Sequence, residues 1–228
     1  HPVAIRRIII KSPDIIPTYE EILSEYKTKG YKDAVESIKF QAESSIIYKT
    51  NPTIRLETNG DPLCEPRSIA NVKLNVIGGN RWRTGNQTIT WKFSVPEDGL
   101  YKIALWLGQW WRDGLPSYRQ IAIDGIIPFE EMVEYKFKFD TGWRTEELKN
   151  SSGKPYLFYL TKGEHELSMT VKMGPIGEII QSLTSDIELL SDILLQIVMI
   201  TGESPDYNYE YDLELKIPNL IEDLQFLS

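Results

Sequence analysis

Apolar side chains recur at every second position through the middle of the chain, from Ser37 to Met173. The clearest runs are QTITWKFSV at 87–95, LYKIALWL at 100–107 and GEHELSMTV at 163–171. Because successive side chains of a strand point to opposite faces, each run has one face for a core and one for solvent. Turn sequences separate the runs: PEDG at 96–99, DG at 124–125 and TKG at 161–163. The pattern predicts a mainly β chain folded as an antiparallel β-sandwich.

Other segments of the same region are also candidate strands. Residues 117–124 and 134–139 alternate well, and four weaker candidates are SIKFQAE at 37–43, TIRLE at 53–57, VKLNVI at 72–77 and PYLFYL at 155–160. The segment DTGWRTEELKN at 140–150 shows no apolar alternation, and we expect it to be a loop.

The two flanks of this region have helical periodicity instead. Residues 16–36 contain a short helix, which Pro17 and Thr18 open and Gly30 ends. From Ile176 to Ile197 the apolar residues are spaced alternately four and three apart, a heptad pattern, and a last short helix is predicted near 218–227. We therefore expect an N-terminal extension with a short helix at 1–36, a β-sandwich at 37–173 and a C-terminal helical pair in an appendage at 174–228.

Composition excludes several classes of function. The net charge of −8 argues against a nucleic-acid binder that neutralises phosphates over a broad face. A single cysteine, Cys64, and only two histidines, His1 and His165, leave little for a disulfide framework, a cysteine-rich zinc site or a histidine relay. No apolar stretch approaches the roughly 18 residues of a membrane span. The chain begins with His1 rather than Met, so we expect a piece of a longer protein.

Three segments resemble the galactose-binding-like jelly-roll family, which includes many carbohydrate-binding modules. In that family a Val-Pro-x-x-Gly-x-Tyr turn, an Asp-Gly strand end and a Leu-x-x-Gly-x-His turn recur, and they match 95–101, 124–125 and 160–165 here. IKFQAESS at 38–45 is similar to the opening strand of the family. The resemblance covers about residues 38–173 and implies a jelly-roll topology with a carbohydrate-binding role.

The same resemblance bears on calcium. In many carbohydrate-binding modules the Glu of the opening strand and an Asp of the closing strand hold a structural calcium ion. Glu43 matches the first of these, whereas GPIGEII at 174–180 takes the place of the second. The resemblance therefore makes Glu43 a possible calcium ligand while half of the pair is missing.

The segment from 197 to 224 resembles an internal part of extracellular solute-binding lipoproteins of ABC importers. This second resemblance implies an exported, cell-surface protein connected with sugar uptake. Its partners would be other domains of a longer chain or subunits of the transporter.

Trp-Arg dipeptides are the most informative pattern for function. They occur as Trp82-Arg83, Trp111-Arg112 and Trp143-Arg144, each in a predicted loop, and Trp110 and Asp113 flank the second. If each strand crosses the sandwich once, antiparallel strand directions bring all three loops to the same end.

Two interpretations of this pattern stay open. Exposed indole faces would stack on sugar rings while the arginines and Asp113 bond the hydroxyls, which makes the chain a non-catalytic carbohydrate-binding or ligand-presenting module. Alternatively, the tryptophans cover the heptad helix that begins near Gly174, and the chain is a structural domain that docks other domains through its helices. Paired acids occur only next to each other in the sequence, so we expect no glycosidase and no other enzyme.

Overall fold

A computed structural model describes residues 15–61, 64–65, 72–110, 114–206 and 208–227. The chain forms two compact units, His1–Met173 and Gly174–Ser228, and each is described by itself. Within the described residues, no helix has both the length and the apolar character needed to cross a membrane.

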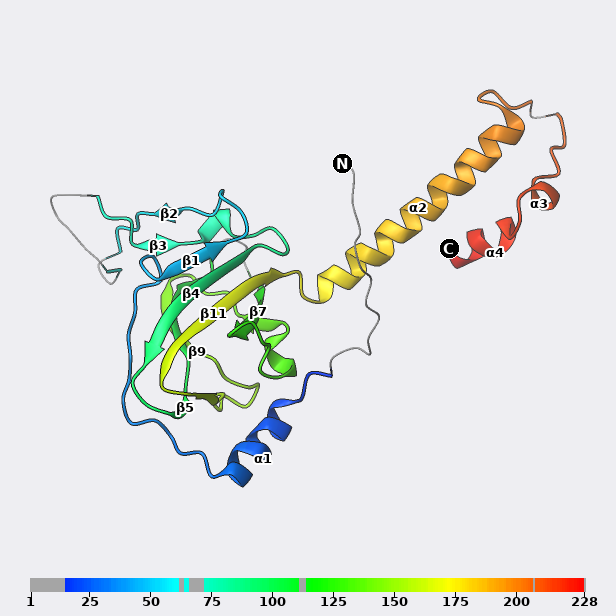
Figure 1. The fold of residues 1–228 in the computed structure, drawn as a ribbon. Coiled ribbons are helices and arrows are strands. Elements are labelled where there is room, and N and C mark those ends of the chain that lie inside the picture. Colours follow the sequence, from blue (N-terminus) through cyan, green and yellow to red (C-terminus); the bar gives the residue numbers. More distant parts are fainter. Residues whose placement is uncertain (1–14, 62–63, 66–71, 111–113, 207, 228) are drawn as a thin grey trace, which may run out of the picture. The chain divides into compact units, whose positions relative to one another are not determined.

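One layer of the first unit is an antiparallel sheet. Five described strands form it in the order β1-β4-β11-β7-β8. Their bounds are Ile46–Lys49 for β1, Thr88–Val95 for β4, Ser117–Ile123 for β7, Tyr135–Phe137 for β8 and Gly163–Lys172 for β11. Figure 1 shows β4 and β11 running side by side through the centre of this layer.

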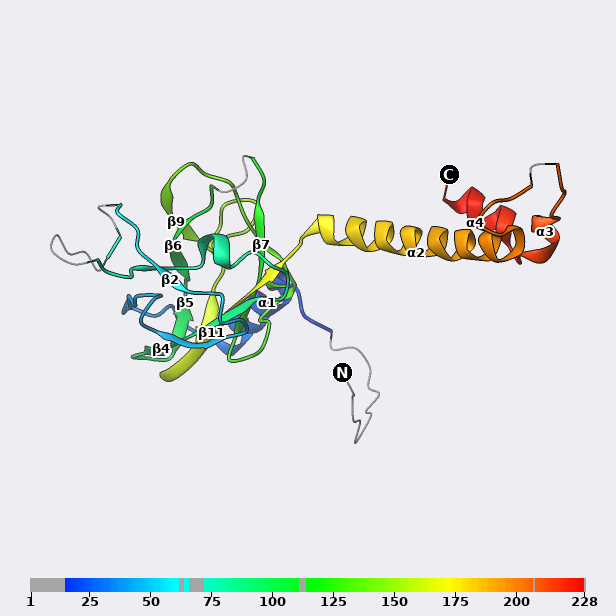
Figure 2. The ribbon, with the colours of Figure 1, turned by 90° about the horizontal axis from the view of Figure 1, so that it is seen from above.

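The facing layer consists of short strand pairs. In the described part of the chain these are β6 with β9, β5 with β10 and β2 with β3. Their bounds are Leu56–Glu57 for β2, Val76–Ile77 for β3, Gly99–Tyr101 for β5, Ala104–Gly108 for β6, Trp143–Glu147 for β9 and Phe158–Leu160 for β10. Figure 2 shows β6 and β9 on the opposite side of the unit from β4 and β11. The mainly β, antiparallel sandwich that the alternation predicts is confirmed.

The core lies between the two layers, where the alternating apolar residues meet. The large sheet contributes Ile89, Trp91, Ile121, Leu167 and Met169, all of them buried. Leu105 and Leu107 of β6 pack against these from the other layer. Burying each such aliphatic side chain stabilises the fold by about 1.5–3 kcal/mol before the entropy cost of ordering is counted.

Helix α1, Tyr19–Lys29, belongs to the same unit as the sandwich. Thr18 caps it in a reciprocal capping box with Glu21, and Gly30 ends it in the left-handed conformation at φ 68°. Its first residue, Tyr19, is 5% exposed and packs with Phe129 and Tyr156 in the core.

The second unit contains three described helices: α2 at Pro175–Thr201, α3 at Leu213–Lys216 and α4 at Leu220–Phe226. Ile193 of α2, Ile217 and Leu220 form a small apolar cluster that joins them. Farther from this cluster, Leu183 and Ile187 of α2 are more than half exposed. The short α3 was not apparent from the sequence.

Two expectations about strands are wrong. Residues 37–43 do not pair as a strand, and the first paired strand is β1, which begins at Ile46. The apolar residues of the earlier segment find partners without a backbone ladder, because Phe40 stacks on Phe93 at 5.6 Å between ring centroids. Conversely, Trp143 and Arg144 lie on strand β9 rather than in a loop.

Candidate functional site

Strand pairing places several predicted site loops at one end of the large sheet. Thr88 at the start of β4 pairs with Thr170 near the end of β11, and Lys172 of β11 pairs with Tyr118 near the start of β7. The end of β8 joins them, since Phe137 pairs with Ser117. The segments before β4, before β7 and after β8 therefore emerge at the same end, in agreement with the strand directions inferred from the sequence.

Trp82, in the segment before β4, packs into the sandwich. Its indole nitrogen donates to the carbonyl of Gln87 at 3.1 Å, and its ring meets Trp91 edge-on at 6.1 Å between centroids. The guanidinium of Arg119 lies 4.4 Å from the centre of the Trp82 ring and donates to the Trp82 carbonyl. Burial lowers the pKa of Arg119 to about 10. Trp82 thus covers a buried arginine, while its neighbour Arg83 is exposed.

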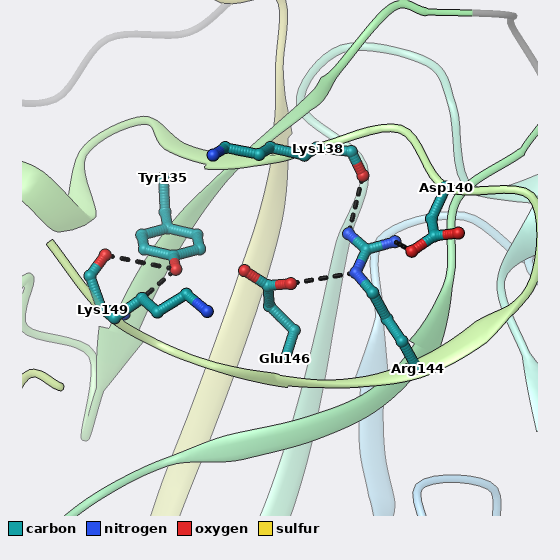
Figure 3. Close-up of polar contacts among 6 residues, drawn as sticks. All are labelled: Tyr135, Lys138, Asp140, Arg144, Glu146 and Lys149. Atoms are coloured by element: carbon teal, nitrogen blue, oxygen red, sulfur yellow. Dashed lines mark hydrogen bonds and ion pairs between the residues drawn. The ribbon is translucent and has the colours of Figure 1, made fainter. Parts of the chain in front are cut away.

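Arg144 of β9 points toward Glu146, Asp140 and the backbone of Lys138 (Figure 3). Its Nε donates to Glu146 at 2.9 Å, and a terminal nitrogen donates to the carbonyl of Lys138 at 2.6 Å. The carboxylate of Asp140 lies 3.8 Å from the other terminal nitrogen. The Arg144 and Glu146 side chains are only 17% and 12% exposed, so they form a largely buried ion pair.

The same interior corner holds Tyr135 of β8 (Figure 3). Its hydroxyl accepts from the backbone N–H of Lys149 at 3.1 Å and lies 3.4 Å from the Lys149 carbonyl. Burial, with a smaller contribution from Glu146, raises the pKa of Tyr135. These contacts fasten the end of the β9 segment to the large sheet.

Because Arg144 and Glu146 face inward, their neighbours on β9 face outward. Trp143 pairs with Gly108 of β6, and Trp106 lies two residues from Gly108 on the same face. Trp106 is 45% exposed. Its strand neighbours Leu105 and Leu107 pack in the core, which identifies the tryptophan face as the outer one.

Trp110 completes this outer face. Its ring meets that of Trp143 at 5.4 Å between centroids and 74° between planes. A methyl group added at Gly108 would overlap the ring of Trp110, so the indole rests directly on the glycine backbone. We call Trp106, Trp110 and Trp143 the tryptophan surface.

Trp106 was missing from the residues expected to bind a ligand. The sequence did contain a signal for it, because Trp106 alternates with Leu105 and Leu107 and must face away from the core that they enter.

The Trp106 side chain also hydrogen-bonds Cys64. Burial raises the pKa of that thiol, which argues against a reactive cysteine.

The remaining predicted site residues divide into two groups. Trp111, Arg112 and Asp113 lie outside the described residues. Glu43 lies in the turn before β1, half-buried. In the described part of the chain, no three His, Cys, Asp or Glu side chains are grouped to hold a metal ion. Calcium at Glu43 stays a prediction.

A separate polar cluster lies where β11 begins. Both ring nitrogens of His165 are 2.7 Å from an acceptor, one from the carboxylate of Asp124 and the other from the carbonyl of Thr161. Lys92 and Glu164 form an exposed ion pair beside it. His165 is 8% exposed and ties the start of β11 to the turns at Asp124 and Thr161, so its role is structural.

Comparisons with known proteins give only distant likenesses. No protein-family model and no curated protein matches this chain. A cycloisomaltooligosaccharide glucanotransferase from Paenibacillus sp., complexed with cycloisomaltoheptaose, is similar at 19% identity and a TM-score of 0.41, over 68% of this chain and 20% of that chain. A family 35 carbohydrate-binding module from Clostridium thermocellum is similar at 17% identity and a TM-score of 0.42, over 59% of this chain and 85% of the module. This chain thus spans a fifth of the length of the glucanotransferase.

Proposed function

We propose that this chain is a non-catalytic carbohydrate-binding module and that its glycan stacks on the tryptophan surface. The observation that carries the proposal is the outward position of Trp106, Trp110 and Trp143 on one face of the β6–β9 pair. Sugar rings present a C–H face that packs on an indole, and their hydroxyls need nearby polar groups. Thr145 and Glu147 of β9 supply such groups, since they face the same side as Trp143.

The acidic residues support a role without catalysis. Three adjacent pairs, Glu20-Glu21, Glu130-Glu131 and Glu146-Glu147, each have a member engaged in structure. Glu21 caps α1, Glu131 accepts from the backbone of Tyr19 at 3.0 Å, and Glu146 pairs with Arg144. A glycosidase instead needs two carboxyl groups free to face a sugar across a cleft.

The second candidate function is docking of other domains or subunits through the helical unit. Leu183, Ile187 and Leu194 of α2 are 55%, 62% and 61% exposed, and together they form a larger apolar surface than isolated surface residues would explain.

We also propose that the protein is exported and is connected with sugar uptake. This part of the proposed function rests on the resemblance of residues 197–224 to solute-binding lipoproteins.

A Trp143→Ala variant of the full chain tests the binding function. We expect it to lose binding in a glycan array and in titration calorimetry, with little change in the free energy of unfolding, because Trp143 lies on the outer face. Trp82→Ala should instead lower that free energy by about 3 kcal/mol, because the partly buried Trp82 ring packs against the core.

Tyr48→Ala is the matched control, because Tyr48 is an exposed aromatic residue at 54% on the other layer. It should bind as the unchanged chain does. If Trp143→Ala binds glycans normally, or if the unchanged chain binds none in the array, the tryptophan surface is not a sugar site and docking becomes the better function.

A further inference from the structure

We infer that the tryptophan surface binds an internal stretch of an extended, uncharged glycan chain rather than a chain end or an acidic sugar. This inference rests on the proposed function and adds the class of glycan. It follows from how the aromatic positions are arranged along β6 and from the charges around them.

The aromatic positions follow one another along the strands. Trp106 and Gly108 are successive outward positions of β6, about 7 Å apart at the rise of an antiparallel strand. Trp110 covers Gly108, and Trp143 lies opposite it on β9. A glycan that contacts both positions must therefore extend along the strand direction over more than one sugar unit.

The position on a sheet face favours internal binding. Recognition of a chain end needs a concave pocket that closes around the last sugar. Trp106 instead lies in the middle of β6, 45% exposed, on the outer face of a strand pair. The exposed part of Trp106, away from its hydrogen bond with Cys64, is where we expect the glycan chain to lie.

The charge of the face selects against acidic sugars. The residues that β6 and β9 direct outward in their pairing are Ala104, Trp106, Gly108, Trp143, Thr145 and Glu147. This set contains a carboxylate and neither lysine nor arginine. The guanidinium of Arg144 is turned inward, where Glu146 offsets its charge. A uronate placed here would meet Glu147 without a cation from these strands.

Titration calorimetry of the full chain with two oligosaccharide series tests the inference. One series is neutral (cello-, xylo- and manno-oligosaccharides from two to six units), and the other is oligogalacturonides of the same lengths. We expect affinity for at least one neutral series to rise about tenfold from the shortest to the longest member, the effect of one added aromatic contact. Oligogalacturonides should bind more weakly at every length.

Trp106→Ala should abolish the rise of affinity with oligosaccharide length, whereas Tyr48→Ala, outside the tryptophan surface, should keep both the rise and the affinity at every length. Urea unfolding of both variants confirms that they fold. Equal affinity for short and long members, tighter binding of oligogalacturonides, or an unchanged rise in Trp106→Ala overturns the inference and leaves carbohydrate binding intact. If the full chain binds neither the neutral oligosaccharides nor the oligogalacturonides, the proposed carbohydrate-binding function itself is contradicted.

Discussion

At the scale of single residues, the titratable group with the clearest role is His165. Burial alone would lower its pKa, but the carbonyl of Thr161 and the carboxylate of Asp124 outweigh burial, and the net pKa is raised. Both ring nitrogens face acceptors, an arrangement that only the doubly protonated ring satisfies. Asp124 also accepts from the backbone N–H of Glu166, which ties the same turn to β11.

This geometry predicts a pH-dependent stability. Because the folded-state pKa of His165 is raised, its contribution is fully present below the ordinary value of about 6.5 and is lost as pH rises through the folded-state value. Asp124→Asn removes the charged acceptor, so it should destabilise the chain more at about pH 6 than at about pH 8. Urea unfolding at both pH values measures this difference.

Proton NMR gives the direct check, since the chain has only two histidines. One of them should titrate above the ordinary histidine pKa in the unchanged chain and move down in Asp124→Asn. Equal destabilisation at both pH values would show that the charge of His165 contributes nothing to folding.

At the scale of elements, β9 shows why a strand can be missed when strands are predicted from apolar alternation in the sequence. Its inward residues are Arg144 and Glu146, a polar pair, so the apolar alternation that marks the other strands is missing. The two side chains bond each other inside the sandwich, and their inward position directs Trp143 outward. Trp82 therefore packs against the core while Trp143 lies on the outer face, although both precede an arginine in the sequence.

The buried pair predicts a specific pattern of stability. Glu146→Gln should lower the free energy of unfolding by about 3 kcal/mol, because it leaves the Arg144 guanidinium buried without its carboxylate. The double variant Arg144→Met, Glu146→Leu should recover most of this loss, since matched apolar side chains need no ionic partner. Chemical denaturation compares the variants. A Glu146→Gln chain as stable as the original would mean that the pair is solvated in solution.

At the scale of the whole molecule, the chain divides at Met173. Ile193, Ile217 and Leu220 form an apolar cluster of the second unit, and the cores of the sandwich draw on the first unit. Each unit thus has buried apolar residues of its own, as independently folding segments require.

A fragment that ends at Met173 should therefore fold alone. We expect it to unfold with the same thermal midpoint as the sandwich in the full chain and to keep any glycan affinity of the full chain. Circular dichroism and calorimetry measure both. A fragment that is unfolded, or that gains affinity, would show that the helical unit supports or covers the tryptophan surface, as the docking interpretation requires.

Local patterns in the sequence were sufficient for most of the fold. Alternation located β4, β7, β8 and β11, and Thr18 and Gly30 marked the ends of α1, because strand faces and helix caps depend on neighbours a few residues away. The outward direction of Trp106 could also be predicted, because it is one residue from Leu105 on the same strand and must therefore face the opposite side.

What only the tertiary structure decided was which distant segments pair. The contact of β9 with β6 joins residues some forty positions apart, and it alone turns Arg144 inward and brings Trp143 beside Gly108. Such pairing depends on the sum of many weak long-range contacts, which no local pattern records.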